Sequence, residues 1–235
     1  MGEEALRALP QQVTKMNTIL QRDFNYGSLD EMERSFRDEL TKAEGVPNEN
    51  ERLTKLHSIV SRDEMNGTLR ILDSLKTWLR VQVPQIEDGN NFGVAVQGDV
   101  QKAVAEEYTA LLTALGELPS YHATRASAWE KVGRRTSKEK KVSRGSSTEK
   151  GGKDGNVAKD TTSTSEEESS TEASFSPDAF LRIVAIDVTA YVTLHHALLG
   201  ARNGLAVAGD MIEKNMEKIV RPKGNGNASG AMFAF

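Results

Sequence analysis

Two long helical patterns are separated by one short polar stretch, Pro84-Gln85-Ile86-Glu87-Asp88-Gly89-Asn90-Asn91-Phe92-Gly93. Pro84 has no amide hydrogen and disfavours helical geometry in the residue before it, so the preceding helix should end at Val83. The central residues 88–91 are typical of a turn, because Gly and Asn tolerate positive φ and Asp and Asn side chains bond to nearby backbone groups. The stretch predicts a short polar loop that joins two antiparallel helices at one end of a bundle.

Apolar residues recur at intervals of three and four on both sides of this loop, which is the spacing of amphipathic helices. We expect one helix over residues 50–83 and another over residues 92–134. Gly67 lies in the middle of the first of these helices and lowers its stability by about 1 kcal/mol relative to Ala. Pro119 removes a backbone hydrogen bond from the second, so we expect a kink near Leu115.

The N-terminal region, residues 1–48, predicts another amphipathic helix over about residues 3–44. Pro10 marks either a kink or the first turn of this helix. A break is expected within residues 26–31, where Ser28 would cap the restarted helix and Glu31 would complete a capping box.

The C-terminal region predicts a last long helix over residues 176–222. Ser176 is its expected cap and Pro177 its first helical residue. Three glycines weaken the apolar pattern in the middle of this helix, at positions 200, 204 and 209. Beyond it, residues 223–235 form a flexible polar arm that ends in an apolar tip, Met232-Phe233-Ala234-Phe235. A terminal carboxylate is a ready ligand for a basic pocket or a backbone nest; the alternative is a frayed end without a role.

Residues 136–175 consist mainly of Ser, Thr, Gly, Lys and Glu, with basic residues first and acidic residues later. Such a segment cannot bury enough apolar surface to offset the entropy of ordering it, so we expect a disordered linker. The basic block at 134–144 is either a nuclear-import signal or a solvated run of charge.

Composition excludes several classes of protein. The net charge of −4 argues against general binding to nucleic acid or to anionic membranes. The chain has no cysteine, which excludes disulfides, thiolate catalysis and Cys-ligated metals. We expect no N-terminal signal sequence and no apolar run long enough to span a bilayer. The sequence therefore predicts a soluble protein of the cytoplasm, the nucleus or both, with no membrane or nucleic-acid partner.

The search for catalytic, cofactor and metal motifs yields no candidate site. His195 and His196 are adjacent, so on a helix they face about 100° apart and cannot chelate one ion. No sequence matches a phosphate-binding loop. The turn half-matches a calcium loop, but Phe92 occupies a ligand position and Asp99 stands where Glu is usual, which makes calcium the weakest hypothesis. We therefore expect a protein that is not an enzyme and uses no cofactor. From the residues alone, the chain predicts an oligomeric helical bundle with an adhesive tail.

The loop stretch 86–94, with Val83-Pro84 before it and Gln97 after it, resembles the activation loop of the 11S (REG-type) proteasome activators. The resemblance as a whole is strongest to their gamma-type subunit and covers all four helices but not the linker. Other stretches resemble this family in the same order along the chain: Pro10-Gln11-Gln12-Val13 through Ile19-Leu20, Lys76-Thr77-Trp78-Leu79, Ala190-Tyr191-Val192-Thr193-Leu194-His195, Lys214-Asn215-Met216-Glu217-Lys218-Ile219 and Arg221-Pro222-Lys223.

The resemblance implies an all-α, up-down four-helix bundle that assembles into a seven-membered ring with a central pore. It also implies that the ring docks on the 20S proteasome without ATP, with tails ending at Phe235 entering pockets between the core particle's α-subunits. The activation loop, residues 84–93, would then open the gate, and Asn90 stands at the position most closely tied to that step. The competing interpretation is a scaffold with the same fold and no gate-opening role.

Three departures from the family pattern accompany the resemblance. Gln85 stands where relatives often carry Arg. The low-complexity segment lies between the third and fourth helices, whereas many relatives have their charged insert between the first and second. Residues 196–209 stand as an insertion in the fourth helix, so we expect that helix either to bulge at its glycines or to project beyond the bundle.

Overall fold

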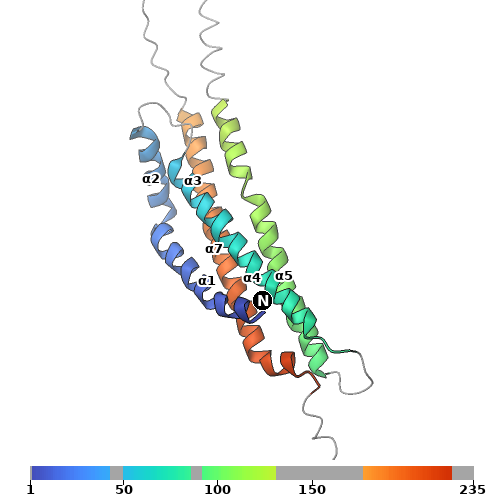
Figure 1. Cartoon of the computed structure of the whole chain (residues 1–235). Coiled ribbons are helices and arrows are strands. Elements are labelled where there is room, and N and C mark those ends of the chain that lie inside the picture. Colours follow the sequence, from blue (N-terminus) through green and yellow to red (C-terminus); the bar gives the residue numbers. More distant parts are fainter. Residues whose placement is uncertain (1, 43–49, 86–91, 131–176, 224–235) are drawn as a thin grey trace, which may run out of the picture.

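The computed structural model describes residues 2–42, 50–85, 92–130 and 177–223. All regular structure in these ranges is helical, which confirms the all-α prediction. The elements are α1 (Gly2–Asp23), α2 (Leu29–Lys42), α3 (Glu51–His57), the π-helical stretch η1 (Ser58–Met65), α4 (Asn66–Val81), α5 (Phe92–Glu117), a helical segment over residues 120–130, and α7 (Pro177–Val220). Figure 1 shows them side by side in an elongated bundle, with the chain running alternately up and down its length.

The first arm of the bundle is broken where the sequence predicted a break. Between α1 and α2, the Ser28 hydroxyl accepts a hydrogen bond from the Glu31 backbone N–H at 3.1 Å. The Glu31 carboxylate in turn accepts from the Gly27 backbone N–H at 3.0 Å. The predicted cap at Ser28 is therefore confirmed, whereas the return bond expected of a capping box is made to Gly27, one residue before the cap. Pro10 lies well inside α1, so the interpretation of Pro10 as a first-turn residue is wrong.

The second arm, α3–η1–α4, begins as predicted. Asn50 caps α3 by accepting from the Leu53 N–H at 3.1 Å. The arm ends at Val81, two residues before the predicted end. Its irregular part lies before Gly67: the backbone widens to π-helical geometry over η1, which the apolar spacing did not predict.

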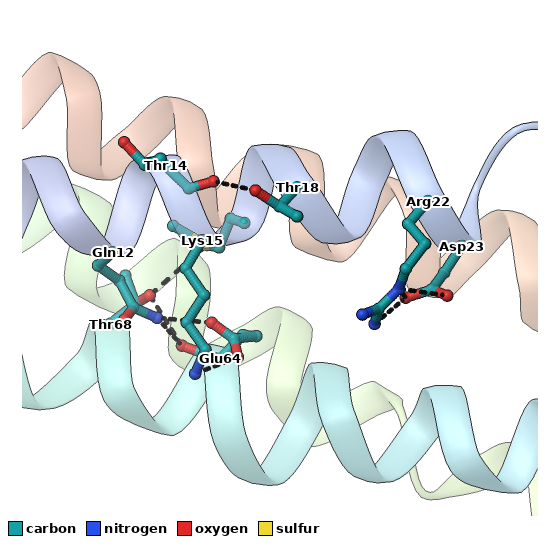
Figure 2. Close-up of polar contacts among 9 residues, drawn as sticks. Gln12, Thr14, Lys15, Thr18, Arg22, Asp23, Glu64 and Thr68 are labelled. Atoms are coloured by element: carbon teal, nitrogen blue, oxygen red, sulfur yellow. Dashed lines mark hydrogen bonds and ion pairs between the residues drawn. The ribbon is translucent and has the colours of Figure 1, made fainter.

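A buried carboxylate joins η1 to α1. The Glu64 side chain, only 1% exposed, accepts from Lys15 Nζ at 2.7 Å and from Gln12 Nε2 at 2.9 Å. Figure 2 shows Lys15 and Gln12 reaching from α1 toward Glu64. Because an unpaired buried charge is costly, this contact holds the two helices in one register.

The third arm breaks at Pro119 instead of kinking near Leu115. α5 ends at Glu117, and the chain becomes helical again at residue 120. The Ser120 hydroxyl donates to the Glu117 carbonyl at 2.8 Å, which satisfies one of the carbonyls that the end of a helix leaves unpaired. The rest of the predicted helix, to residue 134, lies outside the described residues.

The fourth arm, α7, is one uninterrupted helix of 44 residues. The expectation of a bulge at its glycines is therefore wrong. A Cβ at Gly204 would lie 2.3 Å from Glu107 Oε2, and one at Gly209 would lie 2.9 Å from Leu9 Cδ2. These glycines allow α5 and α1 to approach α7 closely. The expectation of a projecting helix is also wrong, because the apolar face stays buried through the segment and beyond it, at Ala201, Leu205, Ala208, Ile212 and Ile219.

α7 contacts α1, α2, α3, α4 and α5 and so forms the centre of the bundle. By length and composition it could also cross a membrane, with a mean hydropathy of 1.4 in its most apolar window. The expectation that no apolar run is long enough to span a bilayer is therefore wrong. In the bundle, however, the apolar face of α7 packs against the other helices. The central helix of a bundle can have an equally apolar sequence. The largest fully buried side chains of the whole core are Phe36, Met16, Leu53, Met65, Leu72, Leu75, Leu79, Ile183, Leu194, Leu198, Leu205 and Ile212.

Candidate functional site

The predicted loop lies between the C-terminus of α4 and the N-terminus of α5, and α7 ends at the same end of the bundle (Figure 1). Four of its residues are described: Pro84 and Gln85 leave α4, and Phe92 and Gly93 open α5. The remaining candidate residues lie outside the described residues, namely Ile86, Glu87, Asp88, Gly89, Asn90 and Asn91 in the loop and Met232, Phe233, Ala234 and Phe235 in the tail. The described part of the site is therefore the base of the loop and the root of the tail.

Exposed apolar side chains occur beside both the loop and the tail root. Val81 is 77% exposed and Val83 41% exposed on the α4 side, and Phe92 is 67% exposed on the α5 side. Val220, the last residue of α7, is 51% exposed. A single exposed apolar residue needs no explanation, but their occurrence at each chain segment that enters or leaves this end favours a contact surface.

Gln97 connects the three helices that meet at this end. Its side chain is fully buried in α5. The Nε2 group donates to the backbone carbonyl of Gln82, just after α4, at 3.0 Å. It also donates to the backbone carbonyl of Ile219, near the end of α7, at 2.6 Å. One carboxamide thus joins the base of the loop to the helix that carries the tail.

Gly93 provides a second connection between the loop and the tail root. A Cβ at this position would lie 2.0 Å from the Pro222 carbonyl oxygen and 2.6 Å from its Cα. Distances below 3.0 Å to backbone atoms cannot be relieved by a side-chain rotation. The second residue of α5 must therefore lack a side chain for the chain leaving α7 to pass this close.

The geometry disfavours the calcium hypothesis. α5 begins at Phe92 and continues through Asp99, so the second half of the half-matched loop is helical. A calcium loop takes its seventh-position ligand from a backbone carbonyl, and here that position is Val94, whose carbonyl lies inside the helix and serves its hydrogen bonds. In the described ranges, no three His, Cys, Asp or Glu residues lie close enough together to hold a metal.

The histidine pair and its neighbours belong to a packed cluster at the α1–α2 break. The Tyr191 hydroxyl donates to the Asp23 carbonyl at 2.9 Å, and its ring centroid lies 4.9 Å from that of Phe24. Burial raises the pKa of Tyr191 to about 12, against the opposing charge of Arg52, so the hydroxyl stays protonated. Burial and the neighbouring His196 lower the pKa of His195. This cluster secures α7 against the first arm.

Sequence reasoning missed the residues that hold the loop base and the tail root together. It noted Gln97 only as part of a resemblance, and it did not identify the carbonyls of Gln82 and Ile219 or the contact of Pro222 with Gly93. A signal was present: Gln97 lies at helical spacing between Gly93 and Val100, on the buried face of α5. A polar residue in an apolar stripe indicates a buried hydrogen-bonding partner.

Comparison with known proteins points to one family. The family model "Proteasome activator PA28, C-terminal" matches residues 46–142, which include the loop and its base. The chain is 25% identical over 199 residues to proteasome activator complex subunit 3 of Homo sapiens, covering 83% of this chain and 62% of that protein. The match to the Mus musculus protein has the same values. The Gallus gallus protein is 24% identical over 162 residues, which cover 69% of this chain and 49% of that protein.

The chain thus spans less than two thirds of the length of these relatives. Among solved structures, the 11S subunit of the Plasmodium falciparum proteasome, PA28, matches with a TM-score of 0.63 at 20% identity. The match covers 94% of this chain and 87% of that one. At this identity the likeness concerns the fold.

Proposed function

We propose that this chain, which belongs to the PA28, or 11S, family of proteasome activators, stimulates peptide degradation by the 20S proteasome without ATP. The observation that supports this proposal best is the joining of the predicted activation loop to the predicted docking tail. Both leave the same end of the bundle, and Gln97 and Gly93 hold their bases together. A protein that binds with one segment and acts with the other needs a fixed relation between the two.

In this proposal the two segments have different tasks. The tails, which end at Met232-Phe233-Ala234-Phe235, bind pockets between the α-subunits of the core particle. Several weak contacts made at once give a high overall affinity. The loops, residues 84–93, are carried on two helices and press on the gate at a defined place. Loops positioned by a rigid scaffold are suited to such a role.

Multivalency requires several copies, and we propose a homomeric ring, most simply a heptamer. Three large apolar side chains on α5 and α7 support self-association, since Leu112, Leu181 and Val207 are each between 45% and 49% exposed. The protein would act as a regulator and not as an enzyme, in the cytoplasm, the nucleus or both. The basic block at 134–144, interpreted above as either a nuclear-import signal or a solvated run of charge, lies outside the described residues.

The test is to mix the purified protein with purified 20S core and a fluorogenic peptide, without ATP and in the presence of a calcium chelator. The proposal predicts a higher rate of peptide cleavage, and native mass spectrometry of the same sample should show a ring of the chain. Co-sedimentation with the core without stimulation would support the scaffold interpretation instead. Stimulation that appears only when calcium is restored would support regulation through the loop by calcium.

A further inference from the structure

The two backbone carbonyls that Gln97 contacts are groups that helices leave unpaired. The last four carbonyls of an α-helix have no partner within the helix. Gln82 follows α4 directly, and Ile219 is the penultimate residue of α7. A Gln carboxamide has two N–H donors on one nitrogen, and here both are used, one for each helix end.

The Gln97 side chain is fully buried, its bond to the Ile219 carbonyl is buried, and its bond to the Gln82 carbonyl is partly buried. Water therefore cannot replace the carboxamide at the Ile219 carbonyl if the side chain is lost, and that carbonyl would remain unpaired unless the end of α7 moved. The Gln97 Oε1 atom has no hydrogen-bond partner in the described part of the chain. The orientation of the amide is therefore set by the two carbonyls, because only its NH₂ group can bond to them.

We propose that Gln97 is a positioning residue that fixes the direction in which the tail leaves α7 relative to the base of the activation loop. Its effect on proteasome activity rests on the proposed function above. In a variant that lacks the Gln97 carboxamide, the tails still bind the core particle. The segment around Pro222, however, no longer holds the loop base at one distance and angle. Binding then persists while gate opening becomes inefficient.

The test compares Gln97→Met with Gln101→Met. The first replacement keeps the length of the side chain and removes both donors. The second makes the same change one turn further along α5, where the Gln101 Nε2 atom has no hydrogen-bond partner among the described residues. Gln97→Asn is a milder second variant, since it keeps the amide but is one methylene too short to reach both carbonyls. Circular dichroism and thermal melting establish that each variant is folded.

The first measurement does not involve the proteasome. Because the chain has no cysteine, spin labels can be attached at Gln85→Cys and Lys223→Cys and diluted with unlabelled chain. We expect a narrow distribution of label distances in the parent and in Gln101→Met, and a broader or shifted one in Gln97→Met and Gln97→Asn. An unchanged distribution in both Gln97 variants would overturn the positioning role, whatever the protein does to the proteasome.

The second measurement titrates each variant against 20S core and a fluorogenic peptide. For Gln97→Met we expect the plateau of stimulation to fall about tenfold, as for the loss of one to two net hydrogen bonds. The half-saturating concentration should stay close to the parent value. A broadened label distance with an unchanged plateau would overturn the functional part of the inference. If the parent itself gives no stimulation, the proposed function fails, and the label distances alone decide the role of Gln97.

Discussion

Single residues at the loop end of the bundle depart from the apolar pattern of α5, and each departure matches a contact. Gly93 lies where the backbone of Pro222 leaves no room for a Cβ. Gln97 lies where two helix ends need donors. Position 98, by contrast, is also Gly, but a Cβ there would meet nothing within 4 Å. Gly93 and Gly98 look alike in the sequence of α5, and only their surroundings distinguish them.

Gly93→Ala and Gly98→Ala should therefore have opposite effects. The Cβ at position 93 would collide with the Pro222 backbone, and such overpacking typically costs about 1–3 kcal/mol. Gly98→Ala should stabilise the protein by up to about 1 kcal/mol, because Ala is the better helix former and the site is open. Chemical denaturation of both variants measures the difference. Equal effects of the two substitutions would show that the tail root does not press on Gly93.

Asn90→Tyr tests the loop alone. Asn90 is the loop residue that the family resemblance ties to gate opening, and a bulky ring there should prevent the loop from making its contact. We expect the variant to bind the 20S core with unchanged affinity and to lose its stimulation of peptide cleavage. Competition with the parent protein for the core measures the binding. Loss of binding together with stimulation would contradict a separate role for the loop.

At the scale of elements, buried polar groups hold the helices in register at the end opposite the loop. Asp187 of α7 is fully buried and accepts hydrogen bonds from Tyr121 at 2.9 Å, Arg125 at 2.9 Å and Asn50 at 3.1 Å. Asn50 is also the cap of α3. One carboxylate thus links three arms of the bundle, and α7 serves as the common partner.

Asp187→Ala should destabilise the protein strongly, by about 3–5 kcal/mol, because it breaks a buried ion pair and removes the acceptor that Tyr121, Arg125 and Asn50 share. Asp210→Ala is the matched control on the same helix. Asp210 pairs with Lys214 at 2.6 Å, but both side chains are more than half exposed. Such a surface pair contributes less than about 0.5 kcal/mol. Urea titrations of both variants give the comparison, and similar midpoints would contradict the assignment of Asp187 to the core.

At the scale of the whole molecule, the proposed activity depends on several copies acting at once. In the proposed ring, each tail would contribute a weak contact, and several tails together would give the affinity. The bundle contributes stiffness: α7 is a single helix of 44 residues, and α1, α2 and α5 pack along it. A bundle of this kind can hold the loops at fixed positions while the tails bind.

Deletion of Phe233–Phe235 should remove binding to the core particle, with affinity reduced by at least about a hundredfold as the multivalent contact is lost. Analytical ultracentrifugation with the core measures binding, and native mass spectrometry controls for an intact ring. Asn90→Tyr, which keeps the tail, is the reciprocal control and should still bind. Retained binding after the deletion would mean that another surface is the anchor.

Much of the architecture follows from local chemistry that the sequence states directly. The all-α class, the break capped by Ser28, the start of the second arm at Asn50 and the start of α7 at Pro177 all depend on residues within one or two turns of each other. Apolar spacing, capping residues and proline act locally, so their effects can be read without knowledge of the rest of the chain. The loop between α4 and α5 was located in the same way.

Only the tertiary structure decided what depends on neighbours far along the chain. The glycines of α7 suggested a bulge, yet the helix continues through Gly204 and Gly209, where the absence of a Cβ leaves room for Glu107 and Leu9. The role of Gln97 likewise depends on carbonyls 15 and 122 residues away. A residue's spacing along one helix determines which face it occupies, but the packing of the other helices determines what that face meets.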